Sequence, residues 1–173
     1  MDGLYDAAVA AASVVRGQSH RQPRVGLVLG SGLGKLADLV TDATVVAYAT
    51  IPGLPTPSVD SHAGRLVLGE LEGQSVAVCQ GRVHLYEGHA AATVVLPVVL
   101  LWKLGIECIV LTNAAGGITA DFAEGALMLI ADHINLTGQN PSAPRVASAS
   151  APGRPARHSA APSSTCIRRR GSQ

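Results

Sequence analysis

Apolar residues in this chain form two recurring patterns, short continuous runs and longer stretches at helical spacing. The alanine-rich residues 6–16 and the almost continuously apolar residues 89–104 predict two helices. Short runs of valine, isoleucine and leucine bounded by glycine or polar residues predict buried strands, and they lie at 25–29, 76–79 and 109–111. Strands that alternate with helices indicate an α/β sheet.

A hairpin adds an antiparallel part to this sheet. Two apolar segments, 65–71 and 74–79, flank Glu72 and Gly73, which predicts a two-residue connection between paired strands. The predicted fold class is therefore α/β, with a mixed β-sheet flanked by helices. The proline-rich string at 51–57 predicts a loop, because proline is not tolerated in a helix interior.

Three further features complete the expected organisation. Leucines recur at helical spacing after residues 30–34 and predict a short helix there. Residues 121–125 predict a loop, and the apolar run at 126–131 predicts one more strand. Trp102, on the second long helix, is expected to be a core residue.

Glycine-rich strings directly follow the three buried strands. They read GSGLG at 30–34, GRVHLYEGH at 81–89 and TNAAGG at 112–117. Ligands of open α/β folds bind at the carboxyl ends of strands. Three strand ends with such strings therefore predict one shared pocket.

The polar side chains of these strings favour an oxyanion such as phosphate. On an extended segment Arg82, His84 and Tyr86 would share one face, with the residues between them turned to the core. Arginine offers a fixed fork of donors, and histidine can donate two hydrogen bonds. The Ser31 hydroxyl and glycine-supplied backbone N–H groups add to the same chemistry.

Each motif also has a simpler interpretation. GSGLG alone equally predicts a tight turn from strand to helix, because it lacks both the third-glycine spacing of a dinucleotide fingerprint and the Gly-Lys-Ser/Thr string of a P-loop. The arginine and histidine segment could be a solvated edge strand. His62 in HAGR is ambiguous by itself, and Glu87 either pairs with a nearby histidine or is solvated. Residues 113–117 form either a turn or a close backbone approach to a ligand.

Composition and charge divide the chain into two parts. Residues 1–142 carry a net charge of −5, whereas residues 143–173 carry +6 and consist mainly of Ala, Ser, Pro and Arg. We expect 1–142 to be a partial globular domain and 143–173 to be a disordered tail, because the tail cannot bury enough apolar surface to offset its ordering entropy. The arginines at 168–170 lack interleaved aromatic residues, which favours an incidental basic tail over a nucleic-acid partner.

Hydropathy predicts no membrane partner. No stretch reaches the roughly 18 uninterrupted apolar residues of a membrane span, and the longest, near 90–101, is interrupted by Thr93 and Pro97. The first residues lack the basic-then-apolar order of a signal peptide. We expect a cytoplasmic protein.

Taken in order, the strings between about 25 and 141 resemble the trimeric class of purine nucleoside phosphorylases. They are GSGLG, IPGLPTPSV, HAGR, GRVHLYEGH, TNAAGG and DHINLTGQNP. Each string alone is weak evidence for this family, but six strings in this order are specific for it. The methylthioadenosine phosphorylases share the fold, whereas GRVHLYEGH and TNAAGG are similar to the purine nucleoside branch.

The resemblance implies an enzyme that cleaves purine ribonucleosides or deoxyribonucleosides with inorganic phosphate, giving free base and (deoxy)ribose 1-phosphate. It implies a homotrimer, with no metal and no dissociable cofactor. His84 and Tyr86 would be catalytic, and Tyr86 and Ala114 would lie against the nucleoside. The implied phosphate ligands are Ser31, His62, Arg82, His84 and the backbone of Ala114.

The resemblance ends near Pro141. The family continues there through a second half, which carries a glutamate and an asparagine that hold the purine, a further phosphate serine and a histidine near the ribose. Residues 143–173 offer no counterpart of these groups. The expected fold is therefore a truncated nucleoside phosphorylase fold. Its alternative function is that of a non-catalytic remnant that at most binds phosphate or associates with full-length subunits.

Overall fold

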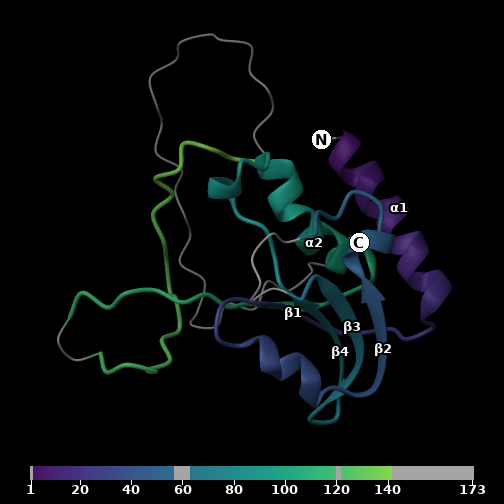
Figure 1. The fold of residues 1–173 in the computed structure, drawn as a ribbon, viewed down its shortest axis with the longest axis horizontal. Coiled ribbons are helices and arrows are strands. Elements are labelled where there is room, and N and C mark those ends of the chain that lie inside the picture. The colour runs from purple at the N-terminus through teal and green to yellow at the C-terminus, as the bar shows by residue number, and fades with distance from the viewer. Residues whose placement is uncertain (1, 57–62, 120–121, 142–173) are drawn as a thin grey trace, which may run out of the picture.

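The computed structural model describes residues 2–56, 63–119 and 122–141 (Figure 1). His62 and the predicted tail at 143–173 lie outside the described residues. The helices are α1 (Asp2–Gln18) and α2 (Ala91–Lys103), with three short 3-10 helices, η1 (Gly34–Leu39), η2 (Tyr48–Thr50) and η3 (Leu85–Glu87). The strands are β1 (Val25–Leu29), β2 (Thr41–Ala47), β3 (Arg65–Leu71), β4 (Gln74–Gln80) and β5 (Cys108–Leu111).

The five described strands form one mixed sheet in the order β2-β3-β4-β1-β5. Strand β1 pairs in parallel with β4 on one side and with β5 on the other. Strand β3 is antiparallel to both of its neighbours, β2 and β4. The predicted mixed α/β sheet is confirmed, and its parallel part brings together the three strands that precede the glycine-rich strings.

The predicted hairpin is β3 and β4. Glu72 and Gly73 both have positive φ values, 50° and 70°. Positive φ at both central residues is the geometry of the tight turn that matches the twist of paired strands. The two-residue connection and the loop after Ile51 are thus confirmed as far as Thr56, where the described segment ends.

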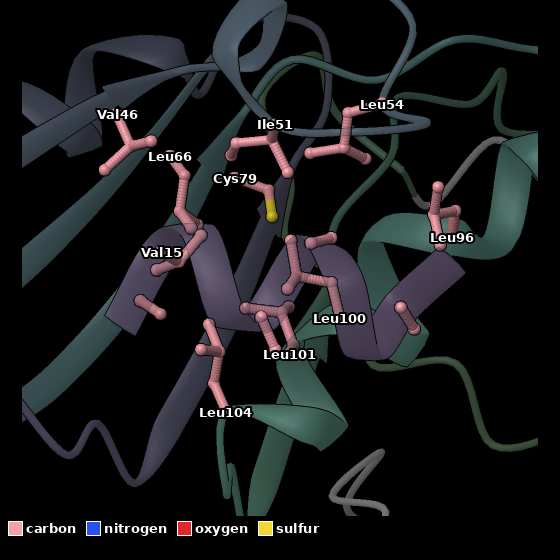
Figure 2. Close-up of a cluster of buried hydrophobic side chains, with 14 of the residues drawn as sticks. Val15, Val46, Ile51, Leu54, Leu66, Cys79, Leu96, Leu100, Leu101 and Leu104 are labelled. Atoms are coloured by element: carbon pink, nitrogen blue, oxygen red, sulfur yellow. The ribbon is translucent and has the colours of Figure 1, made fainter. Parts of the chain in front are cut away.

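Helices α1 and α2 together cover one face of the sheet (Figure 2). Alternate residues of β3 and β4, such as Leu66 and Cys79, point toward them and are fully buried. Val15 from α1 and Leu100 from α2 close the same core at 0% exposure. This packing explains why the two longest apolar stretches of the sequence form helices.

The opposite face is covered chiefly by η1 and its flanking residues. Val67, Val76 and Val78 point to this face and pack with Ala37 and Val40. The short helix predicted after GSGLG is confirmed as a 3-10 helix. Its small apolar side therefore fixes the segment that follows β1 against the sheet.

Gly105 ends α2, as expected. Its φ is +98°, its N–H donates to the carbonyl of Trp102 at 3.1 Å, and the N–H of Ile106 donates to the carbonyl of Leu101 at 3.3 Å. This pair of bonds is the glycine-dependent helix ending known as the Schellman motif. It turns the chain directly into β5, beside β1.

Two expectations about apolar residues are wrong. Trp102 is 41% exposed and lies edge-on to Tyr5, with the Lys103 ammonium over both rings. Residues 126–131 form no strand, and Leu127 is 94% exposed. Trp102 packs on Tyr5 of α1 instead of entering the core. Residues 126–131 pair with no described strand, and β5 is the last strand at its end of the sheet order. Figure 1 shows residues 113–119 and 122–141 looping away from the sheet.

Strand β2 was not predicted from the sequence. It pairs with β3 at an edge, and a register irregularity separates Thr41 from Thr44. Only Val46 on it is buried, so it lacks the continuous apolar run of an interior strand. The β-branched residues at 44–46 were the available signal. Among the described residues, no helix is long and apolar enough to cross a membrane.

Candidate functional site

The carboxyl ends of β4, β1 and β5 lie side by side at one edge of the sheet. The register pairs Leu29 of β1 with Gln80 of β4, and Val28 of β1 with Leu111 of β5. The three glycine-rich strings leave the sheet directly after these residues. The three strand ends therefore lie side by side, and the shared pocket expected there stays a prediction.

Thr112 joins the string after β5 to the string after β1. Its hydroxyl accepts the N–H of Gly30 at 2.8 Å and donates to the carbonyl of Val28 at 3.3 Å. The Thr112 N–H also donates to the Val28 carbonyl, at 3.1 Å. These bonds extend the parallel pairing past the last residue of β5 and fix where the chain leaves β1.

Arg82 connects the string after β4, residues 81–89, to Thr112 as well. Its Nη1 donates to the carbonyl oxygen of Thr112 at 2.7 Å. A Cβ atom added to Gly30 would lie 2.9 Å from the same Nη1 and 2.5 Å from the Thr112 oxygen. Only glycine permits this approach. The guanidinium therefore lies between the residue before Ser31 and the segment that leads to Ala114.

The bond to Thr112 uses one of the five N–H groups of the Arg82 guanidinium. This bond restrains the position of the guanidinium, whose remaining donors lie in one rigid, planar fork. The side chain is partly exposed. A fixed, partly exposed arginine beside a serine and a glycine-rich backbone suits a small oxyanion.

His84 is held by Glu87. The Nδ1 atom of His84 lies 3.0 Å from Oε1 of Glu87, and the same oxygen accepts the backbone N–H of His84 at 2.7 Å. The ring stacks on Tyr86, with centroids 4.7 Å apart and planes at 15°. Of the two interpretations of Glu87, pairing with a histidine is confirmed. The Glu87 contact and the stacking on Tyr86 together restrain the orientation of the ring.

The predicted alternation along 82–86 holds only in its first half. His84 is extended, with φ −123° and ψ 160°, and the 3-10 helix η3 begins at Leu85. Val83 is buried, as expected. Tyr86 is placed by the helical turn instead of strand alternation, and its side chain is 78% exposed. The capping interaction between His84 and Glu87 causes this departure, because it ends the extended segment at His84 and starts η3 at Leu85.

The structure brings the segments that carry Ser31, Arg82 and Ala114 to one edge of the sheet, and both Ser31 and Ala114 are exposed there. His84 follows Arg82 on the same segment and is directed by Glu87 and Tyr86. Convergence of Ser31, His62, Arg82 and His84 around one phosphate-sized space beside the Ala114 backbone stays a prediction, and His62 lies outside the described residues.

Sequence reasoning missed two groups that support this edge. The buried Tyr48 hydroxyl donates to the carbonyl of Gly81, the residue directly after β4, at 2.9 Å. Burial raises the pKa of this phenol, so it remains a donor. Gln80, only 8% exposed, donates from Nε2 to the carbonyl of Gly34 at 2.7 Å. The signal for Gln80 was a polar residue directly after the apolar run 76–79.

Comparison with known proteins agrees with this architecture. The family described as the Phosphorylase superfamily matches residues 24–170, and the chain belongs to this superfamily. Its similar relatives include purine nucleoside phosphorylase 1 of Bacillus subtilis, 47% identical over 131 residues, and the purine nucleoside phosphorylase of Bos taurus, 45% identical over 126 residues. These matches cover 76% and 71% of this chain, but 48% and 44% of the relatives. The chain thus spans about half the length of these relatives.

Solved structures show the same likeness. Isoform 2 of purine nucleoside phosphorylase from Schistosoma mansoni, in complex with cytosine and ribose-1-phosphate, is 38% identical with a TM-score of 0.62. The match covers 67% of this chain and 41% of that one. A purine nucleoside phosphorylase in complex with ribose-1-phosphate is also 38% identical, with a TM-score of 0.63 and coverage of 68% and 43%.

Proposed function

We propose that this chain carries the phosphate-binding half of a purine nucleoside phosphorylase site. In the proposed reaction an oxygen of inorganic phosphate forms a bond to C1′ of a purine ribonucleoside or deoxyribonucleoside. The C1′–N9 bond breaks, and the purine leaves with the electron pair and takes up a proton. The products are free base and (deoxy)ribose 1-phosphate.

The observation that carries the proposal is the position of Arg82. Its guanidinium is fixed by the Thr112 carbonyl beside Gly30, where three strand ends meet. Phosphate is a poor nucleophile, so a site must orient it and offset its charge. A fixed arginine fork with the Ser31 hydroxyl and the Ala114 backbone supplies both functions. The bound dianion in turn stabilises a transition state with oxocarbenium character.

His84 and Tyr86 complete the proposed site. Because Glu87 and Tyr86 restrain its ring, His84 would hydrogen-bond to the substrates from a defined position. Tyr86 stacks on this ring and presents an apolar face to the ribose. His62 is the fifth proposed ligand, on the basis of the HAGR string alone.

A second candidate function has its own support. The chain covers less than half the length of the relatives above, and large apolar residues at 118–136 are exposed. A non-catalytic subunit that binds phosphate or associates with full-length subunits would fit both observations. The homotrimer and the cytoplasmic location belong to the phosphorylase proposal and rest on the resemblance to the trimeric class.

Phosphate binding tests the proposal directly. We expect titration calorimetry with inorganic phosphate to show one site, weakened about tenfold or more in Arg82→Ala because a hydrogen bond to a charged group is lost. Arg24→Ala is the matched control, since Arg24 lies at the other end of β1 and pairs with Glu107 at 2.8 Å. An absence of binding, or equal binding by both variants, would reject the proposal.

Turnover separates the two candidate functions. With saturating phosphate and inosine, we expect the 173-residue chain to release little or no hypoxanthine, because the departing purine must be stabilised and the resemblance places those groups in the second half. Adding that half in frame should restore turnover. An ordinary rate in the 173-residue chain that Arg82→Ala abolishes would reject the remnant and support the enzyme.

A further inference from the structure

The loop from Gly30 to Gly34 is held at both ends by side chains from other elements. At the first end, the Gly30 N–H donates to the Thr112 hydroxyl at 2.8 Å. At the second end, the Gly34 carbonyl accepts Nε2 of Gln80 at 2.7 Å. Ser31 and Gly32, between the two ends, are exposed. The conformation of this loop is therefore restrained by the hydrogen bonds at its two ends.

We propose that Gln80 is a positioning residue for phosphate binding, acting through the loop that carries Ser31. This inference rests on the proposed function. Gln80 is the last residue of β4, and its side chain spans from the sheet to the start of η1. Because Gln80 belongs to the strand that leads into Arg82, one amide couples the position of Ser31 to that of the arginine.

The Gln80 amide is itself oriented from outside the loop. Its Oε1 accepts the Nε–H of Arg65, the first residue of β3. Nη2 of Arg65 donates to Oδ1 of Asp38 in η1 at 2.8 Å. The acceptor side of the amide is thus occupied by an arginine, which leaves only the NH₂ side to face Gly34. Gln80 thus contacts η1 twice, directly at Gly34 and through Arg65 at Asp38.

The hydrogen bonds at Gly30 and Gly34 matter because side-chain packing contributes little to holding the residues between them. Gly32 has φ +85°, a conformation that other residues rarely adopt, and an added Cβ there would meet nothing within 4 Å. Leu33 is 40% exposed. Without the Gln80 bond, the Gly34 end of the loop would lose its polar anchor, and Ser31 would sample several positions instead of one. An ordered ligand group binds more tightly than a mobile one because less entropy is lost on binding.

The test compares Gln80→Met with Gln74→Met in the full chain. Methionine has a similar length and no amide, so Gln80→Met removes both bonds. Gln74 is the exposed first residue of the same strand and provides the matched control. We expect inorganic phosphate to bind Gln80→Met about tenfold more weakly, the value of one hydrogen bond, and Gln74→Met like the parent chain. The amide of Gly32 should show a lower heteronuclear NOE only in Gln80→Met.

A purely structural role would give a different result. Val15→Ala, on the core side of α1, should lower the melting temperature while phosphate affinity and the Gly32 NOE stay unchanged. If Gln80→Met behaves in this way, the positioning role is rejected and the proposed function stands. If the parent chain binds no phosphate, the proposed function and this inference fail together.

Gln80→Glu provides the second variant if Gln80→Met does not fold. Its carboxylate keeps the partner for Arg65 but has no N–H for Gly34. A fall in the Gly32 NOE would support the inference without relying on affinity, which the added charge also affects. An unchanged NOE would overturn it.

Discussion

Strand β1 and residues 126–131 are similar apolar runs with opposite outcomes. Strand β1 pairs on both sides and is covered on both faces, with Val28 4% and Leu29 1% exposed. Leu127 is 94% and Met128 is 59% exposed, in a segment with no described helix or strand. The two sequences carry almost the same local signal. The difference lies in what surrounds them.

This comparison shows that an apolar run becomes a strand only where partner strands and covering helices exist. A strand alone leaves its N–H and C=O groups without ladder partners, and its side chains bury little surface. Helices α1 and α2 cover one face over β1, and η1 covers the other. Beyond β5 the described residues offer neither. The predictions below contrast the packed region with the extended region, residues 113–119 and 122–141.

The largest contrast should appear in amide hydrogen exchange. We expect the amides of Leu27 and Val28 to be protected about 10³-fold or more, since they exchange only on global unfolding. The amides of Leu127 and Met128 should exchange near the rate of an unstructured peptide. Mass spectrometry or NMR of the intact chain measures both. Strong protection at 127–128 would show that the extended region packs in solution.

Matched leucine truncations should give the next largest contrast. Leu66→Ala removes a fully buried side chain from the core below α1 and should lower the free energy of unfolding by about 2–5 kcal/mol. Leu127→Ala should change it by less than about 0.5 kcal/mol. Urea denaturation followed by circular dichroism measures both values. Equal losses would contradict the contrast.

Most of the fold could be predicted from the sequence because it is encoded locally. The apolar runs of β1, β4 and β5, the turn residues Glu72 and Gly73, and the helix stop at Gly105 each carry their own physical signal. Strand β2 was missed because an edge strand needs only one apolar face. The strand expected at 126–131 failed because its partners are not among the described residues.

The site was predictable in its residue types and less so in its connections. Glycine and polar residues after strands indicated where Ser31 and Arg82 would lie. The Thr112 carbonyl that fixes Arg82 gave no signal, because a backbone acceptor is defined by the fold alone. The 3-10 turn at Leu85 escaped detection because a side-chain contact, that of Glu87, competes with strand alternation.

A pair of glycine substitutions tests how close the packing is at the site edge. In Gly30→Ala the new Cβ would lie 2.5 Å from the Thr112 oxygen and 3.1 Å from Cα of Asn113. We expect a loss of about 1–3 kcal/mol in unfolding free energy, because backbone atoms cannot give way as side chains do. Gly116→Ala, with nothing within 4 Å, should be neutral within about 0.5 kcal/mol. Thermal and urea unfolding of both variants measure these losses. A neutral Gly30→Ala would mean that the backbone around Gly30 and Thr112 is less closely packed than the distances above indicate.

The smallest effect should come from the buried thiol of Cys79, which reports on the packed region alone. Burial raises the pKa of this thiol from 9.0 to about 12. The folded chain therefore keeps the proton where the unfolded chain loses it, so the stability is fully present below pH 9 and falls as the pH rises toward 12. Between pH 9 and pH 10 the loss should be about 1 kcal/mol at 25 °C. The measurement is the difference in unfolding free energy between the parent chain and Cys79→Ala at each pH, which cancels the other titrating groups. A difference that stays constant from pH 8 to pH 10 would show that Cys79 is ionised as easily in the folded chain as in the unfolded one, and hence that solvent reaches the core between β4 and α2.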